Sequence, residues 1–301
     1  MIRKPNCKIN LGLYVTGKRP DGYHNLETVF LPIPLCDELE MEPAEDFSFR
    51  QEGIQLDSGT EGNLCVKAYR MLQQDFPQIG NLRIRLHKRI PFGAGLGGGS
   101  SDAAESLILI NSLFRLGLSD AQLASYAARL GSDCPFFITN RPAFATGRGE
   151  LLEPLPPLDM GGYDMLLLKP DDAVSTAEAY RNITPAPAPT DLRKAVLQPV
   201  ESWRNLIHNQ FEDSVFPQHP AIRACKEQLY REGALYASMT GSGSCVYGFF
   251  PKGQAPDIKG AHLIAVNMLQ SPTSPENGWA DAGSYGLVYP QRFLVSISAS
   301  S

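Results

Sequence analysis

A stretch rich in glycine and serine lies between residues 91 and 104, where the chain reads Pro-Phe-Gly-Ala-Gly-Leu-Gly-Gly-Gly-Ser-Ser-Asp-Ala-Ala. The segment before it alternates like a strand, and the segment after it has helical spacing. Glycines let backbone N–H groups approach an anion closely, and the N-terminus of a helix adds a partial positive charge. This stretch therefore predicts a phosphate-binding loop and a nucleotide ligand.

Two common phosphate-binding loops fit this stretch less well. A P-loop needs a lysine directly after its last glycine, and here a serine pair follows. Gly93, Gly95 and Gly98 match the Rossmann fingerprint, but that fold needs a second parallel strand after the helix. The sequence instead turns at 116–118 and begins another helix after Ser119 with a capping pattern. We favour an ATP loop that ends in a serine pair; a dinucleotide loop and a glycine-rich turn without a ligand are the alternatives.

The size and charge of the chain indicate a globular protein with a small-molecule ligand. Its 301 residues, 43% of them hydrophobic, can bury a full core and favour two lobes, with a boundary near Leu158. A net charge of −5 gives no electrostatic basis for a nucleic-acid partner. The sequence gives no indication of the oligomeric state.

Cysteine spacing and hydropathy favour a cytoplasmic protein. The six cysteines are scattered and form no Cys-x-x-Cys or Cys/His cluster, so we expect reduced thiols and no zinc site. The N-terminus lacks the apolar core of a signal peptide, and no stretch approaches the length of a membrane span. We therefore expect neither export nor a membrane partner.

Periodicity predicts the elements that flank the glycine-rich loop. Residues 8–15 alternate apolar and polar side chains, which predicts a half-buried strand with Lys8 and Asn10 on the same face. We expect 17–25 and 184–189 to be loops and 131–138 to be a short loop that leads into a strand. Further predicted strands are 27–35, 82–87, 163–169 and 245–250, and predicted helices are 62–76, 101–114, 120–130 and 221–232.

Three stretches together resemble the GHMP kinase superfamily, which is named after its galacto-, homoserine, mevalonate and phosphomevalonate kinases. They are 5–10, the glycine-rich loop, and 239–245, which reads Met-Thr-Gly-Ser-Gly-Ser-Cys. The resemblance implies an α+β fold with a ribosomal-protein-S5-like N-terminal lobe, here 1–158, and a ferredoxin-like C-terminal lobe, here 159–270. It also implies that ATP and Mg²⁺ bind between the lobes. Residues 271–301 form a tail to which no role is assigned.

Two more motifs are similar to one branch of this family, whose members phosphorylate the 2-hydroxyl of 4-diphosphocytidyl-2-C-methyl-D-erythritol in the non-mevalonate isoprenoid pathway. They are Arg-Pro-Asp-Gly-Tyr-His-Asn-Leu at 19–26 and Gly-Ser-Asp-Cys-Pro-Phe-Phe at 131–137. By this resemblance Asp133 is the catalytic base and Lys8 stabilises charge on the reacting groups. From the residues alone, Lys8 could instead be a solvated charge on an edge strand, and Asp133 could be a helix or turn cap.

The resemblance also implies the binding residues. Tyr23 stacks on the cytosine ring, His24 bonds to the edge of the base, and Tyr180 forms the second face, although Tyr180 could instead pack on the core. Asn10, Thr240 and Gly241 complete the predicted substrate site. The predicted ATP-binding residues are Pro91, Gly93, Ala94, Gly95, Leu96, Gly97, Gly98, Gly99, Ser100 and Ser101, with Ser101 also a ligand of Mg²⁺.

Two other functions remain as alternatives. Another small-molecule kinase of the same fold, for homoserine or mevalonate, would not need Tyr23 and His24. A non-catalytic nucleotide sensor or an S5-like RNA-binding module would not need Lys8 and Asp133, and the acidic charge also argues against it.

Overall fold

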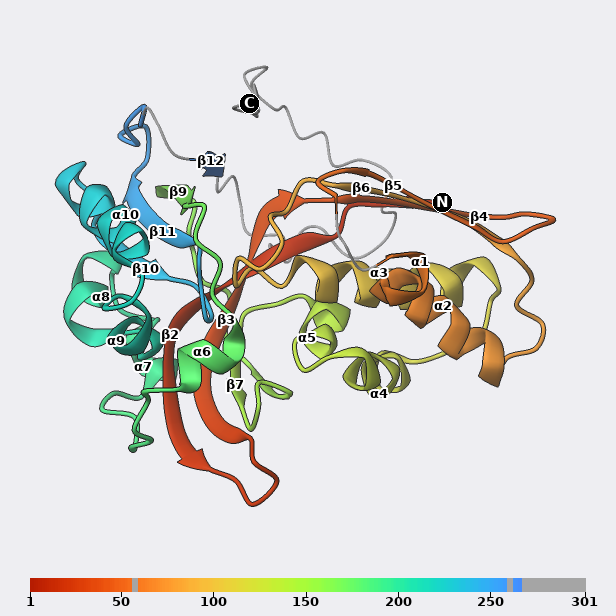
Figure 1. The fold of residues 1–301 in the computed structure, drawn as a ribbon, viewed down its shortest axis with the longest axis horizontal. Coiled ribbons are helices and arrows are strands. Elements are labelled where there is room, and N and C mark those ends of the chain that lie inside the picture. The colour runs from red at the N-terminus through yellow and green to blue at the C-terminus, as the bar shows by residue number, and fades with distance from the viewer. Residues whose placement is uncertain (56–58, 259–261, 267–301) are drawn as a thin grey trace.

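The computed structural model describes residues 1–55, 59–258 and 262–266, and Figure 1 shows their arrangement. The strands are β1 (Ile2–Arg3), β2 (Asn6–Lys18), β3 (His24–Cys36), β4 (Glu38–Pro43), β5 (Ser48–Gly53), β6 (Leu82–Lys88), β7 (Ala143–Thr146), β8 (Leu151–Pro154), β9 (Tyr163–Lys169), β10 (Tyr236–Met239), β11 (Val246–Pro251) and β12 (His262–Val266). The helices are α1 (Gly59–Gly62), α2 (Leu64–Asp75), α3 (Gly98–Leu113), α4 (Asp120–Leu130), α5 (Cys134–Thr139), α6 (Thr176–Tyr180), α7 (Leu192–Ala195), α8 (Val200–Leu206), α9 (Phe211–Val215) and α10 (Pro220–Arg231).

The long hairpin of β2 and β3 joins the two halves of the molecule (Figure 1). It belongs to a sheet of order β2-β3-β7-β8. Ile9 and Leu11 pack in one hydrophobic cluster, whereas Leu13 and Val15, further along the same strand, pack in another with C-terminal residues. The two lobes therefore share the strand that carries Lys8 and Asn10.

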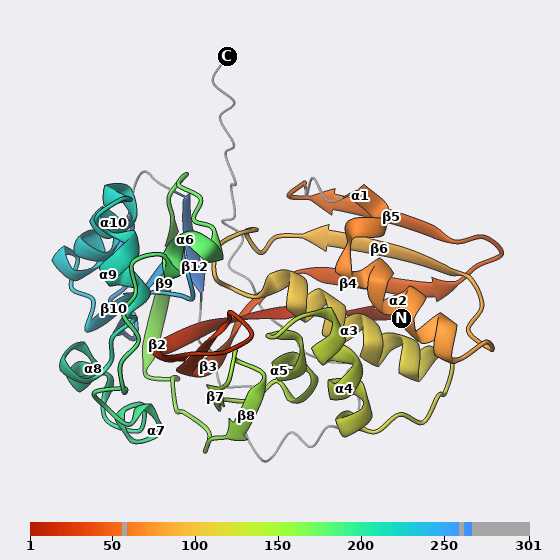
Figure 2. The same ribbon diagram turned by 60° about the horizontal axis from the view of Figure 1, so that its bottom comes forward.

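The N-terminal part contains a sheet of order β1-β4-β6-β5, covered on one face by α2 and α3 (Figure 2). In β6, Leu82, Ile84 and Leu86 are buried, while Arg83 and Arg85 point outward and pair with glutamates of β4. This alternation is that of a strand with one solvated face. It places the end of β6 beside the start of α3, where the glycine-rich loop lies.

The C-terminal part contains a sheet of order β10-β11-β9-β12. Met165 and Leu167 of β9 enter one hydrophobic cluster, and Leu166 and Leu168 enter another. Because both faces of this sheet are covered, the strand is a continuous apolar run rather than an alternating one. The α10 helix packs on β10 and β11.

Most predicted elements are confirmed, and two are corrected. The strand expected after 131–133 is instead helix α5, which begins directly after Asp133, has a proline in its first turn and ends at Asn140 in the left-handed conformation. Proline fits the first turn of a helix because no partner for its missing N–H is needed there. The loop expected at 17–25 is shorter, since β2 extends to Lys18 and β3 begins at His24.

Further expectations concern the cysteines, membrane spans, the lobe boundary and the tail. All six cysteines are free thiols. In the described part of the chain, no helix has both the length and the apolar character needed to span a bilayer. The predicted lobe boundary at residue 158 stays a prediction, and residues 271–301 lie outside the described residues.

Candidate active site

The glycine-rich loop connects β6 to α3 and is anchored by two buried side chains. Ala94 and Leu96 are buried in a hydrophobic cluster, while Gly93, Gly95 and Gly97 adopt positive φ angles of 60°, 74° and 71°. A Cβ atom on Gly95 would lie 2.0 Å from the carbonyl oxygen of Thr240. The loop therefore needs glycine both for its backbone conformation and for its close packing on the 240–244 turn.

Lys8 is buried under this loop, with only 3% of its surface exposed. Its Nζ atom donates to Asn10 Oδ1 at 2.7 Å and to the Gly95 carbonyl at 3.0 Å, and it forms an ion pair with Asp133 Oδ2 at 3.4 Å. The bonds to Asn10 and Gly95 use two of the three N–H donors of the ammonium. Lys8 is therefore not a solvated surface charge, and the predicted shared face with Asn10 is confirmed.

Asp133 occupies the N-cap position of α5 without making a side-chain capping bond. About a third of its side chain (32%) is exposed, compared with 4% for Lys8. Gly149, after β7, also lies close, because a Cβ atom there would be 3.7 Å from Asp133 Oδ1. The carboxylate is thus paired on its inner side and open to a ligand on its outer side.

Asn10 and Thr240 connect this ion pair to the C-terminal lobe. The Asn10 amide nitrogen donates to Thr28 Oγ1 at 2.9 Å, and the Asn10 backbone N–H donates to Thr240 Oγ1 at 3.1 Å. The Thr240 hydroxyl lies 3.2 Å from both Asn10 Oδ1 and the Gly95 carbonyl. The glycine-rich loop and the 239–245 stretch are therefore in direct contact.

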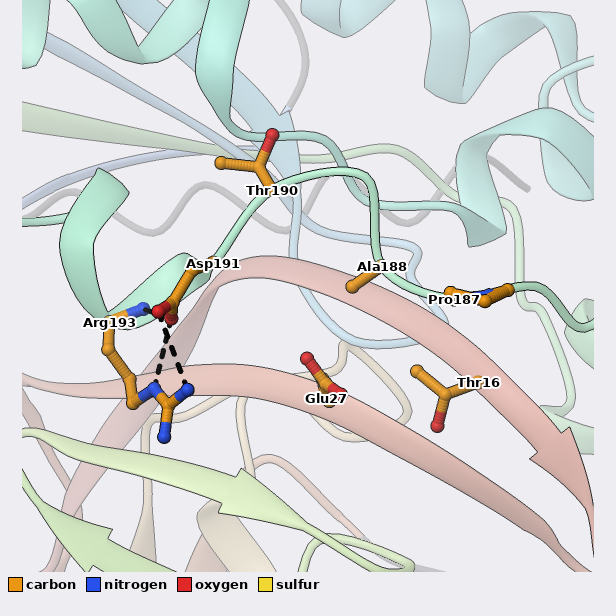
Figure 3. Close-up of a pocket in the computed structure, with 7 residues that line it drawn as sticks. All are labelled: Thr16, Glu27, Pro187, Ala188, Thr190, Asp191 and Arg193. Atoms are coloured by element: carbon orange, nitrogen blue, oxygen red, sulfur yellow. Dashed lines mark hydrogen bonds and ion pairs between the residues drawn. The ribbon is translucent and has the colours of Figure 1, made fainter.

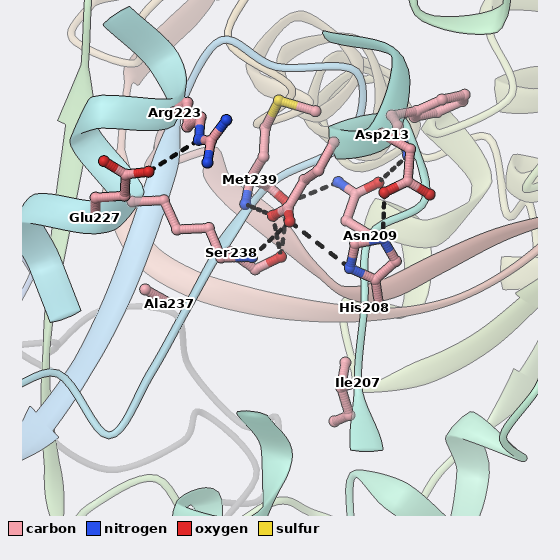
Figure 4. Close-up of polar contacts among 12 residues, drawn as sticks. Ile207, His208, Asn209, Asp213, Arg223, Glu227, Ala237, Ser238 and Met239 are labelled. Carbon is pink, nitrogen blue, oxygen red and sulfur yellow. Dashed lines mark hydrogen bonds and ion pairs between the residues drawn. The ribbon is translucent and has the colours of Figure 1, made fainter. Parts of the chain in front are cut away.

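The 239–245 stretch is itself held by buried polar groups of the neighbouring segment (Figure 4). Asn209 is fully buried and donates to the carbonyls of Met239 at 2.7 Å and Gly241 at 2.9 Å. Glu212 accepts from the Met239 N–H at 2.8 Å and from Ser238 at 3.0 Å. Periodicity gave no indication of Asn209 and Glu212, because a single buried polar side chain produces no repeating pattern in the sequence.

The first turn of α3 carries the residues expected near a metal ion. Ser101 Oγ is buried and has no hydrogen-bond partner, so it is available to a ligand of the loop. The next residue, Asp102, pairs with Lys88 at 2.7 Å, and Lys88 also pairs with Asp37. Burial raises the pKa of Asp102 to about 8, and the charge of Asp37 adds to this effect against the opposing charge of Lys88. Among the described residues, no group of three or more His, Cys, Asp or Glu side chains is placed to hold a metal.

The predicted base-binding residues lie at the hairpin turn and on α6. The rings of His24 and Tyr180 stack with centroids 4.7 Å apart, and Tyr180 also meets Phe211 edge-on. Burial, together with the charge of Asp133, raises the pKa of Tyr180. Tyr23 is 57% exposed. The structure thus brings His24 and Tyr180 together, and it packs Tyr180 on the core as well.

Arg148 is a residue that the sequence analysis missed. Its guanidinium lies 5.0 Å from the centroid of the Tyr23 ring, and its neighbour Gly149 lies beside Asp133. A cation that pairs with Glu150 at 3.5 Å therefore lies against a predicted base-binding residue, in the same loop as the glycine beside Asp133. Its position between two glycines, in the loop after β7, is the signal that could have identified it.

Two other features contain none of the predicted site residues. A cavity of about 430 Å³ lies beside the β2–β3 hairpin (Figure 3) and is lined by Thr16, Glu27, Pro187, Ala188, Thr190, Asp191 and Arg193. Thr28 contacts Asn10, so its neighbour Glu27 projects from the opposite face of the hairpin. His208 and Asp213 are in contact at 3.0 Å but are exposed, as expected for surface residues.

Comparison with known families identifies the family of this chain. The model of the GHMP kinases N terminal domain matches residues 63–141, and that of the GHMP kinases C terminal region matches 192–264. The chain belongs to the GHMP kinase family. This confirms the predicted fold and makes the protein a kinase.

The chain can be aligned with its relatives over most of their length. A Bacteroides thetaiotaomicron protein named 4-diphosphocytidyl-2-C-methyl-D-erythritol kinase is 53% identical over 85% of this chain and 95% of that protein. A Porphyromonas gingivalis protein of the same name is 48% identical over 83% of this chain and 92% of that protein.

Solved structures give a consistent picture. A crystal structure titled 4-(cytidine 5'-diphospho)-2C-methyl-D-erythritol kinase has a TM-score of 0.70 and 35% identity, and covers 82% of this chain and 89% of that one. The mevalonate kinase of Methanococcus jannaschii has a TM-score of 0.63 over 84% of this chain and 92% of its own, but at 14% identity it shows the common fold alone.

Proposed function

We propose that this kinase transfers the γ-phosphoryl group of ATP to the 2-hydroxyl of 4-diphosphocytidyl-2-C-methyl-D-erythritol, a step of the non-mevalonate isoprenoid pathway. The names of relatives at about half identity support the substrate. The observation that carries the chemistry is the Lys8–Asp133 pair, at 3.4 Å, beside the glycine-rich loop. Such a pair suits a reaction that needs a base and a fixed positive charge near an attacking hydroxyl.

Asp133 is the proposed base. The 2-hydroxyl oxygen forms a bond to the γ-phosphorus, the bond from that phosphorus to the bridging oxygen of ADP breaks, and the hydroxyl proton passes to the Asp133 carboxylate. Lys8 lies beside this carboxylate and opposes negative charge on the attacking oxygen. Its remaining donors are held by Asn10 and Gly95, so the ammonium does not have to reorganise during the reaction.

The loop from Gly95 to Ser101 is the proposed phosphate site, with its backbone N–H groups and the N-terminus of α3 directed at ATP. ATP would bind as its Mg²⁺ complex, in which the ion neutralises phosphate charge and Ser101 would supply a ligand. The unpartnered Ser101 hydroxyl fits this role.

The aromatic residues are the proposed cytosine site. Tyr23 and Tyr180 would stack on the two faces of the base, which requires the His24 ring to leave the face of Tyr180 and bond to the edge of the base. Arg148 contacts the Tyr23 ring and pairs with Glu150 at 3.5 Å, and its charge suits the diphosphate of the substrate. Six free thiols favour a cytoplasmic enzyme. A small anionic substrate favours an enzyme without nucleic-acid or membrane partners.

Formation of ADP by the purified protein tests the proposal. ATP and Mg²⁺ are supplied with 4-diphosphocytidyl-2-C-methyl-D-erythritol, and parallel reactions contain homoserine, mevalonate or galactose. We expect ADP with the cytidyl substrate alone. Turnover of another acceptor would keep the kinase and refute the cytosine site, and no turnover of any acceptor would refute the proposed reaction.

A further inference from the structure

A histidine outside the predicted site is held between two carboxylates. His219 Nδ1 lies 3.0 Å from Asp172 Oδ2, and His219 Nε2 lies 3.1 Å from Glu178 Oε1. The side chain of His219 is 16% exposed, and those of the two acids are 30% and 24% exposed. His219 immediately precedes α10, Asp172 follows β9, and Glu178 belongs to α6. The cluster therefore ties three segments together.

The donor and acceptor chemistry of this cluster requires a protonated ring. Ionised carboxylates only accept hydrogen bonds, whereas a neutral imidazole has one donor and one acceptor nitrogen. Only the imidazolium can donate to Asp172 and Glu178 together. Desolvation lowers the pKa of His219, but its hydrogen bonds to Glu178 and Asp172 outweigh this, so the net pKa is raised above its usual 6.5. The pKa of Glu178 is lowered, chiefly by the hydrogen bond from His219.

The cluster reaches the proposed base site through α6. Glu178 lies two positions before Tyr180 in this five-residue helix, and a helix this short is held mainly by tertiary contacts. Other contacts of α6 are a bond from Ser214 to the Ala179 carbonyl at 2.5 Å, the packing of Tyr180 on Phe211 and the stacking of Tyr180 on His24. The bond between His219 and Glu178 ties α6 to the residue before α10 through a charged pair.

We propose that His219 is a positioning residue: in its protonated form it fastens α6 and so holds Tyr180 in place for the nucleobase, which makes affinity for the cytidyl substrate fall as the pH rises. This inference rests on the proposed function for its substrate. When His219 loses its proton, one carboxylate loses its donor, and two like charges remain near each other. Because the native pKa is raised, the contact is complete below about pH 6.5 and is lost as the pH rises through the raised value.

Other ionisable groups near the cluster and the base site must be accounted for. The positive charge of Arg181, just after α6, acts on Glu178, and the negative charge of Asp172 acts on the Cys225 thiol of α10. The Lys169 ammonium donates to the Asp172 carbonyl at 3.2 Å. His24 is also an imidazole, and its ring stacks directly on Tyr180. A change of KM with pH in the wild-type enzyme is therefore not sufficient, and a variant that leaves His24 in place is needed.

The variant Glu178→Gln distinguishes the contribution of His219 to the pH dependence of KM from that of His24. A glutamine amide can accept from the imidazolium at low pH and can donate to the neutral ring at high pH, while His219 Nδ1–H continues to donate to Asp172. From about pH 6 to about pH 9, we expect the KM for the cytidyl substrate to rise roughly three- to tenfold in the wild-type enzyme. It should stay nearly constant in Glu178→Gln and be high throughout in His219→Gln. The kcat and the KM for ATP should change little, and His87→Gln, on β6, is the matched control.

Hydrogen exchange of the α6 amides gives a readout that does not depend on turnover. After correction for intrinsic rates, we expect protection at 178–180 to fall with rising pH in the wild type but not in Glu178→Gln. If the wild-type enzyme does not phosphorylate the cytidyl substrate, the proposed function fails, and this exchange experiment still tests the contact. If Glu178→Gln keeps the full pH dependence of KM and of protection, His219 does not position α6.

Discussion

The proposed phosphate end and the proposed base end of the site are built in different ways. At the phosphate end, Lys8, Asn10 and Thr240 are almost completely buried, and their polar atoms are bonded to one another or to the loop backbone. At the base end, Tyr23 is largely exposed on a hairpin turn, and Tyr180 belongs to a short helix. Phosphoryl transfer needs fixed charges, and a rigid buried network supplies them. Recognition of a base needs ring faces that can admit a ligand.

This comparison predicts that substitutions at the phosphate end lower kcat, and those at the base end raise KM. Asp133→Asn should have the largest effect, because an amide cannot accept the hydroxyl proton. We expect kcat to fall by about 10²–10⁴-fold, the usual contribution of a general base. Steady-state kinetics measures kcat, and isothermal titration measures the affinity for the cytidyl substrate. Near-normal turnover would remove Asp133 from the mechanism.

Gly95→Ala should disrupt the junction of the loop with the C-terminal lobe, and Gly93→Ala is its matched control. Both glycines have positive φ, but a Cβ on Gly95 would meet the Thr240 carbonyl, and a Cβ on Gly93 meets nothing within 4 Å. Gly93→Ala should cost about 1 kcal/mol of unfolding free energy, as left-handed backbone does for alanine. Gly95→Ala should cost about 1–3 kcal/mol more. Equal losses in urea unfolding would show that the close contact is unimportant.

The sequence predicts elements with local signals better than it predicts contacts between distant segments. The alternation of 8–15 gave β2 and the shared face of Lys8 and Asn10. The strand expected after Asp133 was wrong because its short apolar run fits a buried helix equally well, and packing on α3 and α4 decides between them. Asn209 and His219 depend on partners far along the chain, so no local pattern revealed them. Arg148 also has a distant partner, and the glycines on either side of it are its local signal.

Tyr23→Ala should change the base end with little effect on the chemistry. Loss of one stacking face should raise the KM for the cytidyl substrate by roughly tenfold or more. Tyr23→Phe keeps the ring and should behave almost as the wild type, and kcat should stay within about threefold in both. If kcat falls instead of KM rising, the two ends of the site are not separable as described.

Thr240→Val should have the smallest effect at the phosphate end. The valine keeps the shape but leaves the buried Asn10 N–H without its acceptor, which costs about 1–3 kcal/mol. We expect a lower Tm and a severalfold lower kcat, while Thr240→Ser, which retains the hydroxyl, should restore both. Failure of the serine variant to restore kcat would argue against a role for this hydrogen bond.

The position of the new phosphate in the product tests the central claim most directly. The claim is that a base held at Tyr23 and Tyr180 places the tertiary 2-hydroxyl against Asp133. With the cytidyl substrate labelled with ¹³C at C2 of the methylerythritol, NMR of the purified product should show phosphorus coupling to this quaternary carbon. A phosphate on a primary or secondary hydroxyl, or ADP formed without a phosphorylated cytidyl product, would contradict the account.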